Sequence, residues 1–236
     1  MKADDGITSE RANWTFSGEV ATRFDSHARK SIPGYAEGHQ IVAALSDFFC
    51  IPDSLCYELG TSTGALLHTV AVQNAHKTNA RFIGVDIEED MITLARERCK
   101  DLSAVTIVQD DLRLHPYEKA DLFISYYVLQ FVAPRDRQQM LDTIYEKLNW
   151  GGAFIWFEKV RGPDARFQDI LINLYNNFKA NNGFSADEIL NKTESLKGVM
   201  EPFSTEGNRA MLKRAGFKDI MSIYRNLCFE GVLCIK

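Results

Sequence analysis

One glycine-containing segment has residue types that can bind a ligand through the backbone. Glu58-Leu59-Gly60-Thr61-Ser62-Thr63-Gly64 follows a short apolar run and precedes an apolar stretch with helical spacing. Gly60 permits a tight turn and Gly64 permits close packing of the next helix, so backbone N–H groups can face a ligand. The middle position, Ser62, is not glycine, which disfavours the close approach of a pyrophosphate. An ordinary strand-to-helix turn remains the alternative.

Acidic residues stand at or just after the ends of the next two apolar runs. Asp86 ends the first of them, where a carboxylate can accept hydrogen bonds from both hydroxyls of a ribose. Asp110-Asp111-Leu112 follows the second, where an aspartate can accept a hydrogen bond from the exocyclic amine of an adenine. A helix cap at Asp86 and a solvated acidic turn at 110–112 remain open alternatives.

Two adjacent tyrosines follow a fourth apolar run. Tyr126 and Tyr127 can offer an aromatic face to a cationic ligand and a hydroxyl group to a substrate, although simple packing is equally open. The five histidines have no metal-ligand spacing and are expected at the surface or at helix caps. The five cysteines have no C-x-x-C pair, so we expect them to pack in the core, and we predict no metal site.

These candidate residues need a scaffold, and the hydrophobic pattern predicts one. Strand patterns cover residues 55–59, 81–86, 105–108, 121–125, 153–157, 220–224 and 228–235. Helix patterns cover residues 36–49, 65–74, 91–99, 137–148, 167–181, 186–200 and 205–215. Strands that alternate with helices predict a parallel sheet covered on both faces, and the last two strands predict an antiparallel hairpin.

The segments outside this alternation have less regular patterns. Residues 1–12 are polar and expected to be loose, and residues 14–35 show no clear period. Residues Asn149–Gly152 are expected to close the preceding helix. Within 167–181, Tyr175 and Asn176 lie off the apolar stripe and are therefore better candidates for a site. The stripe itself is expected to cover the sheet and consists of Ile170, Leu171, Leu174 and Phe178.

The layout is that of a class I methyltransferase, a Rossmann-like α/β fold. We expect a mostly parallel seven-stranded sheet with a C-terminal antiparallel hairpin and a helical insertion. The chain of 236 residues is expected to form a single domain, 1–236, with an N-terminal lid segment, 1–35, and the insertion at 160–204. The net charge of −5 disfavours direct nucleic-acid binding. No apolar run reaches the roughly 18–20 residues of a membrane helix, so we expect a cytoplasmic protein without a membrane partner.

Several segments resemble the carboxy-S-adenosylmethionine synthase family. They are Ser31-Ile32-Pro33-Gly34-Tyr35, Glu58–Gly64, Leu129-Gln130-Phe131, Asn149–Ala153, Phe178–Ser185 and Lys213–Phe217. The resemblance extends from about Trp14 to the C-terminus. It implies a homodimeric enzyme of the class I methyltransferase fold that binds S-adenosyl-L-methionine and, with prephenate, converts it to its carboxylated form.

The resemblance also implies roles for individual residues. It assigns cofactor binding to Tyr35, to Gly60, Thr61 and Ser62 at the methionine end, to Asp86 and Ile87 at the ribose, and to Asp111 and Leu112 at the adenine. Two positions depart from the family. Tyr126 stands where the family has asparagine, and an ungapped alignment places Thr193 where the family has an arginine that reaches the added carboxylate. The loss of that guanidinium removes a bidentate carboxylate clamp.

The leading hypothesis is therefore an S-adenosylmethionine-dependent transferase that acts on a small molecule through an altered substrate site. Tyr126 and Tyr175 are the catalytic candidates, and Tyr126 is also expected at the cofactor. Tyr127, Asn176 and Thr193 are the substrate-binding candidates. Three alternatives remain open: cyclisation of S-adenosylmethionine to azetidine-2-carboxylate and methylthioadenosine, retained carboxy-S-adenosylmethionine synthase activity with prephenate, and a non-catalytic module that binds the cofactor.

Overall fold

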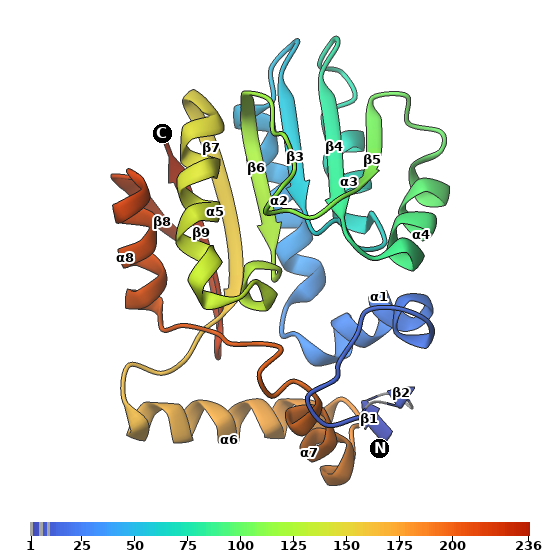
Figure 1. Cartoon of the computed structure of the whole chain (residues 1–236), viewed down its shortest axis with the longest axis vertical. Coiled ribbons are helices and arrows are strands. Elements are labelled where there is room, and N and C mark those ends of the chain that lie inside the picture. Colours follow the sequence, from blue (N-terminus) through green and yellow to red (C-terminus); the bar gives the residue numbers. More distant parts are fainter. Residues whose placement is uncertain (1, 5–6, 9) are drawn as a thin grey trace.

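The molecule is built around one seven-stranded sheet. The computed structural model describes residues 2–4, 7–8 and 10–236. In sheet order, the strands are β5 (Val105–Gln109), β4 (Arg81–Asp86), β3 (Leu55–Leu59), β6 (Ala120–Tyr126), β7 (Leu148–Lys159), β9 (Phe229–Ile235) and β8 (Asp219–Asn226). The first five are parallel, and β9 pairs antiparallel with both β7 and β8 (Figure 1). The predicted class I methyltransferase layout is confirmed.

The central strands are apolar on both faces because helices cover both. In β3, Leu55, Tyr57 and Leu59 belong to one buried cluster and Cys56 belongs to the other, as alternation along a strand requires. Helices α2 (Tyr35–Phe49) and α3 (Ala65–Gln73) contribute to the cluster with Cys56, and α5 (Pro134–Lys147) and α8 (Thr205–Ala215) contribute to the other. Helix α4 (Glu89–Cys99) packs beside β5 and α3.

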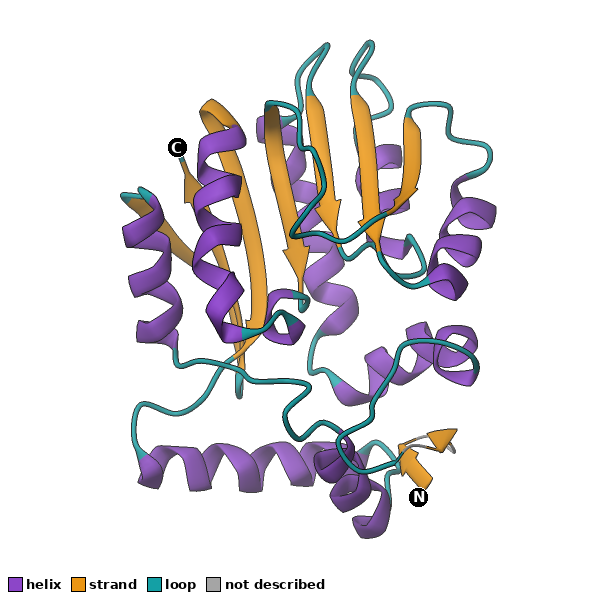
Figure 2. Ribbon diagram, in the orientation of Figure 1, coloured by secondary structure: helices purple, strands orange, loops and turns teal. Residues whose placement is uncertain are grey.

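The carboxyl ends of the parallel strands meet at one edge of the sheet, and the remaining elements gather beyond that edge (Figures 1 and 2). Helix α1 (Glu19–Ser31) lies nearest to the strand ends. Helix α6 (Ala165–Asn181) runs across the bottom of the view, and α7 (Ala186–Ser195) lies beside its end. The 3₁₀ turn η1 (Leu129–Phe131) follows β6, and strand β1 (Lys2–Asp4), which pairs with β2 (Ile7–Thr8), packs against α7.

The structure corrects several expectations about these elements. Residues 19–31 form a helix, so the expectation of no clear period there is wrong: the buried Val20 and Ala28 and the partly buried Phe24 recur at the helical spacing of four residues. Residues 149–152 belong to strand β7 rather than closing helix α5. Helix α7 ends at Ser195 rather than near residue 200. Two short strands lie within residues 1–12, which were expected to be loose, although residues 1, 5–6 and 9 lie outside the described part.

The expectation that the apolar stripe of α6 covers the sheet is also wrong. Ile170 and Leu174 are 48% and 44% exposed, and only Leu171 of the stripe packs against the described core cluster, together with Tyr175. The reason is the placement of α6, which crosses the end of the sheet instead of lying on a face (Figure 1). Helix α6 therefore has an apolar side that the described chain does not bury.

Candidate functional site

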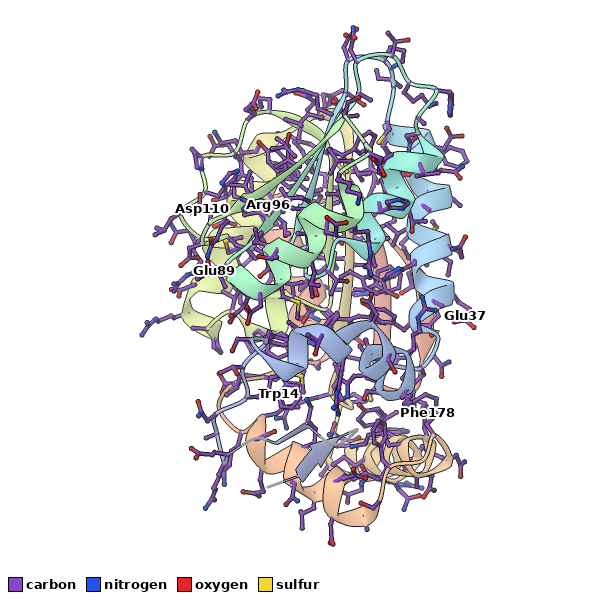
Figure 3. The ribbon with its side chains drawn as sticks, turned by 90° about the vertical axis from the view of Figure 1, so that its right-hand side faces the viewer. Trp14, Glu37, Glu89, Arg96, Asp110 and Phe178 are labelled. Carbon is purple, nitrogen blue, oxygen red and sulfur yellow. The ribbon has the colours of Figure 1, made fainter. Side chains whose placement is uncertain are left out.

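A cavity of about 1370 Å³ lies at the carboxyl ends of β3, β4, β6 and β7 and is covered by α1, α6 and α7. In the side view of Figure 3, Trp14 and Phe178 lie between α1 and the layer of α6 and α7. The cavity brings together every residue that the sequence analysis assigned to cofactor binding, substrate binding or catalysis: Tyr35, Gly60, Thr61, Ser62, Asp86, Ile87, Asp111, Leu112, Tyr126, Tyr127, Tyr175, Asn176 and Thr193. Ligands of open α/β sheets bind at this edge.

In the turn after β3, the N–H groups of Gly60, Thr61, Ser62 and Gly64 all donate within the chain, contrary to the expectation that they face a ligand. The N–H groups of Gly60 and Thr61 donate to the Val85 carbonyl at 2.8 and 3.1 Å. Gly60 is at φ +69°, and a Cβ there would lie 2.6 Å from Val128. Ser62 also has a left-handed backbone, at φ 51°, which is uncommon for a non-glycine residue and concentrates at ligand-binding turns. The turn is therefore shaped by more than helix packing.

Asp86 links this turn to the end of β4. Its Oδ2 accepts from the Ser62 N–H at 2.8 Å and its Oδ1 accepts from the Glu88 N–H at 3.1 Å. Glu88, not Asp86, is the N-cap of α4, which disfavours the helix-cap alternative. Burial raises the pKa of Asp86. Each carboxylate oxygen keeps a lone pair, so the group can still accept from ribose hydroxyls. Ile87 lies beside it at the rim of the cavity and is exposed.

The acidic turn after β5 is ion-paired. Arg113 Nη2 lies 2.6 Å from Asp111 Oδ2, and this guanidinium holds the pKa of the Asp111 carboxyl below its ordinary value. Asp110 accepts from the Asp111 N–H at 2.8 Å and lies 2.8 Å from His115 Nδ1. The Leu112 carbonyl accepts from the Tyr117 hydroxyl at 2.9 Å. Asp111 therefore lines the cavity as one half of a surface ion pair rather than as a simple solvated carboxylate.

The tyrosines after β6 form a buried aromatic group with Tyr35. The Tyr126 hydroxyl donates to the Tyr35 carbonyl at 2.7 Å, and the two rings are 5.3 Å apart. Tyr127 has φ +63°, and its buried hydroxyl has no hydrogen-bond partner within the described chain. Burial raises the pKa of Tyr35, Tyr126 and Tyr127. All three are neutral phenols at pH 7, which suits aromatic contact with a cation better than proton abstraction.

Two histidines belong to this region, and the expectation of surface or capping roles is wrong for them. His39 is 6% exposed, with its ring 4.7 Å from Tyr35 and 4.9 Å from Tyr126. Burial lowers the pKa of His39 to about 4, so the imidazole is neutral. His27 is equally buried and stacks on Trp14. The spacing of four residues between Tyr35 and His39 on one helix is the signal that could have found His39.

The covering helices bring a second group to the cavity. The Tyr175 hydroxyl on α6 donates to the Ser31 carbonyl at the end of α1, at 3.0 Å. The ammonium groups of Lys159 and Lys179 lie 4.3 and 4.7 Å from the centre of the Tyr175 ring. Asn176 lines the same cavity. Neither lysine was among the site candidates from the sequence, although Lys179 belongs to the Phe178–Ser185 segment that carries the family resemblance.

Thr193 on α7 lines the cavity but directs its hydroxyl to its own helix. Its Oγ1 donates to the Ile189 carbonyl at 2.9 Å, and the residue is exposed. Lys192 stacks its ammonium on the Trp14 ring. The residue at position 193 therefore presents no charged group to a ligand.

Metal and membrane features can be stated for the described residues. Among residues 2–4, 7–8 and 10–236, no three His, Cys, Asp or Glu side chains group so as to hold a metal ion. Within the same residues, no helix is both long and apolar enough to cross a bilayer.

Comparison with known proteins identifies the family. Residues 57–152 match a family described as a methyltransferase domain. Carboxy-S-adenosyl-L-methionine synthase of Staphylococcus epidermidis is 35% identical over 224 residues, covering 94% of this chain and 97% of that protein. The enzyme of the same name from Escherichia coli is 33% identical over 227 residues, covering 95% and 92%. The chain belongs to the carboxy-S-adenosyl-L-methionine synthase family.

The solved structures that resemble this family member show the fold. Human N-acetylserotonin methyltransferase in complex with S-adenosylmethionine has a TM-score of 0.64 and 19% identity, and a putative O-methyltransferase from Nostoc punctiforme has 0.65 and 19%. The alignments cover 93% and 94% of this chain but only 56% and 62% of those chains. Family and fold together make S-adenosyl-L-methionine the cofactor or substrate of this chain and make the chain an S-adenosylmethionine-dependent transferase.

Proposed function

We propose that this family member acts on a small molecule through a substrate site altered relative to carboxy-S-adenosylmethionine synthase. The observation that carries the proposal is Thr193, whose hydroxyl is engaged with Ile189 where the family resemblance implies a carboxylate-binding arginine. Two arginines of this chain, Arg113 and Arg161, do line the cavity. Arg113 is paired with Asp111, and Arg161 donates to the Pro202 carbonyl at 3.1 Å. Neither stands at the position of that clamp.

A second departure supports the same proposal. Tyr126 replaces an asparagine of the family, and the chain makes room for it at Gly38, where a Cβ would overlap the Tyr126 hydroxyl. The larger ring reaches across to α2 and bonds the Tyr35 carbonyl. The wall near the sulfonium is thus aromatic where the resemblance implies an amide.

Different residues of the cavity bind different parts of the two ligands. Gly60, Thr61 and Ser62 hold the methionine end, Asp86 and Ile87 the ribose, Asp111 and Leu112 the adenine. Tyr35 and Tyr126 offer aromatic surface to the sulfonium. Tyr127, Tyr175, Asn176 and Thr193 line the space for the second substrate. The cofactor supplies a carbon activated by the sulfonium, so the protein has to align the reactants and exclude water.

Cyclisation of S-adenosylmethionine is the second candidate, favoured by the aromatic enclosure of Tyr35, His39, Tyr126 and Tyr127. In that reaction the amino nitrogen attacks the γ-carbon and loses a proton. The C–S bond breaks, and methylthioadenosine leaves with the electron pair. Tyr126 and Tyr175 would then restrict the methionine chain to its folded form.

Product analysis by mass spectrometry separates these functions. The purified protein is incubated with S-adenosylmethionine alone and with S-adenosylmethionine plus prephenate. Our proposal expects neither methylthioadenosine in the first reaction nor a product 44 Da heavier than the cofactor in the second. Methylthioadenosine without a second substrate would establish the cyclase, and the heavier product would show that Thr193 does not prevent carboxylation. If the cofactor binds and no panel of small acceptors gives turnover, the chain is a binding module.

A further inference from the structure

Helix α6 turns one of its sides to the cavity. The lining residues in its middle and last turns recur at the spacing of a single helix face. They are Leu171, Ile172, Tyr175, Asn176 and Lys179. Ile172 belongs to this side and is still 47% exposed, so its apolar surface is open toward the cavity.

Helix α7 presents a similar side. Ala186, Ile189, Leu190 and Thr193 line the cavity at intervals of three or four residues, which again is one helix face. Leu190 is 61% exposed. The Thr193 hydroxyl donates to the Ile189 carbonyl of the same helix at 2.9 Å. This side of α7 therefore offers the cavity mainly apolar surface.

Aromatic rings from three further elements line the same cavity. The ring of Phe16 packs edge-on against Phe131 of η1, with ring centres 4.9 Å apart. It lies 6.2 Å from the ring of Phe24 on α1 and 6.3 Å from that of Trp14. All four rings line the cavity, and Phe16, Phe24 and Phe131 are only partly buried. These rings thus leave flat apolar surface for a ligand to cover.

The two charged residues of α7 that line the cavity are engaged with protein groups. Glu194 is paired with Arg11 at 3.0 Å, and the Lys192 ammonium lies on the Trp14 ring. A charged ligand placed against α7 would lose its hydration, and it would gain a counter-charge only by displacing one of these partners. The surroundings therefore favour an uncharged ligand.

The cavity also has room for a second ligand. A pocket for one drug-sized ligand usually measures about 300–1,000 Å³, whereas this cavity measures about 1370 Å³. The groups assigned to the cofactor, at Gly60–Ser62, Asp86 and Asp111, lie in the loops after β3, β4 and β5. The apolar surfaces belong to the elements that cover the strand ends. The space beyond the cofactor is therefore bounded by apolar side chains.

We propose that the second substrate is an uncharged molecule with a flat apolar body, held between the cavity sides of α6 and α7 and the rings of Phe16 and Phe131. The inference deepens the proposed function and rests on it, because it takes the cofactor to occupy the loops after β3, β4 and β5. Ile172 and Leu190 are the specificity-determining residues, since the apolar surface that each leaves open is removed from water when such a body binds.

Calorimetry on the full chain tests the inference, with 2-naphthol, phenol and 6-hydroxynaphthalene-2-sulfonate as probes. Each probe is titrated into the chain with and without saturating S-adenosylhomocysteine. The second ring of 2-naphthol adds roughly 50 Å² of apolar surface, so 2-naphthol is expected to bind about 10-fold more tightly than phenol. The sulfonate keeps both rings and adds a charge, so it is expected to bind about 10-fold more weakly than 2-naphthol, or weaker still.

Polar substitutions test where the rings bind. Ile172→Asn and Leu190→Asn are each expected to weaken 2-naphthol by about 5-fold or more and to leave the affinity for S-adenosylhomocysteine within about 2-fold of wild type. Because both side chains are about half exposed, neither change opens a hole in the core. Val72→Asn is the matched control, at a half-exposed position of α3 outside the cavity lining, and leaves both affinities unchanged.

The outcomes separate this inference from the proposed function. Equal affinities for 2-naphthol and phenol would overturn the inference. So would a sulfonate that binds as tightly as 2-naphthol, or Ile172→Asn and Leu190→Asn chains that bind 2-naphthol normally. Failure of the wild-type chain to bind S-adenosylhomocysteine would instead count against the proposed function, and the titrations without it would still decide the inference. Circular dichroism on each variant confirms that it is folded.

Discussion

At the scale of single residues, Gly38 determines whether Tyr126 can occupy its position. A methyl group at residue 38 would overlap the Tyr126 hydroxyl, so Gly38→Ala is expected to displace the ring and its bond to the Tyr35 carbonyl. We expect a loss of about 1–3 kcal/mol in the free energy of unfolding, and weaker binding of S-adenosylmethionine. Thermal unfolding and calorimetry measure the two effects.

Two further variants serve as controls for this prediction. Gly207→Ala in α8 adds a methyl group that meets Phe203 at an ordinary 3.4 Å, so it should be neutral or stabilising. Shortening the opposing side chain in Gly38→Ala/Tyr126→Asn should restore stability. A Gly38→Ala chain as stable as wild type would show that Tyr126 moves aside freely.

The buried carboxyl of Glu58 predicts a pH dependence of stability. Burial raises its folded pKa to about 8 from an ordinary 4.5, so the folded state binds the extra proton between these values. Stability from this group is complete below about pH 4.5 and is lost as pH rises toward 8. When the pH rises from 5 to 8, we expect the free energy of unfolding of the wild type to fall by about 2 kcal/mol or more beyond the fall for Glu58→Gln. Urea unfolding at several pH values measures this.

The measurement must separate the contribution of Glu58 from that of a second buried titratable group, His39. The pH dependence of stability from His39 has the opposite sign. Burial lowers its folded pKa to about 4, so the unfolded state binds more protons below pH 6.5 and stability falls on acidification. A window of pH 7 to 8 therefore isolates the carboxyls. The exposed Glu97→Gln is the control and should follow the wild-type curve. Parallel curves for Glu58→Gln and wild type would contradict the prediction.

At the scale of elements, α1 is fastened to the cofactor turn by one polar cluster. Arg98 of α4 contacts Asp25 of α1 at 2.6 Å and the Thr63 hydroxyl at 2.7 Å, and Thr63 in turn donates to Asp25 at 2.7 Å. We expect Asp25→Asn to loosen α1, with at least 10-fold faster amide exchange in residues 19–31 and a shorter residence time of S-adenosylmethionine. Arg81→Gln, which breaks the exposed pair with Glu118, should change neither. Unchanged exchange in α1 would show that its apolar contacts suffice.

The sequence predicted secondary-structure elements well where both faces of a strand are buried or where apolar residues recur at helical spacing. The parallel strands and helices α2, α3, α5 and α8 follow from apolar spacing alone, and the candidates that follow strands line one cavity because the strand ends converge. Tyr35, Tyr175, Asn176 and Thr193 reach the same cavity from helices α2, α6 and α7. Helix α1 was missed because the apolar residues of its buried side, Val20, Phe24 and Ala28, stand among charged residues, and because Gly18 offers no side-chain cap. Lys159, Lys179 and His39 were missed because lysine and histidine are usually exposed, and only the packing of α6 across the sheet edge and of α2 on the sheet encloses them.

At the scale of the whole molecule, the apolar side of α6 fits a second copy of the chain. Phe167, Ile170 and Leu174 lie on one side of this helix and are each more than 40% exposed, and the family resemblance implies a homodimer. We propose that α6 forms the dimer contact. Ile170→Asp/Leu174→Asp should then halve the mass measured by light scattering, whereas Phe48→Asp, at a still more exposed apolar position of α2, should leave it unchanged. A wild-type monomer would contradict the proposal.

The strand order carries a consequence for how the protein is made. Strand β9 (Phe229–Ile235) follows β8 in the chain but lies between β7 and β8 in the sheet, and it is almost wholly buried. During synthesis, α6 and α7 leave the ribosome before the strand that completes the sheet beneath them. Until β9 has emerged, β8 has no partner strand in this sheet and the long edge of β7 is open to pairing with other chains. A stop codon that removed only this strand would thus give an aggregating product rather than a weakened enzyme.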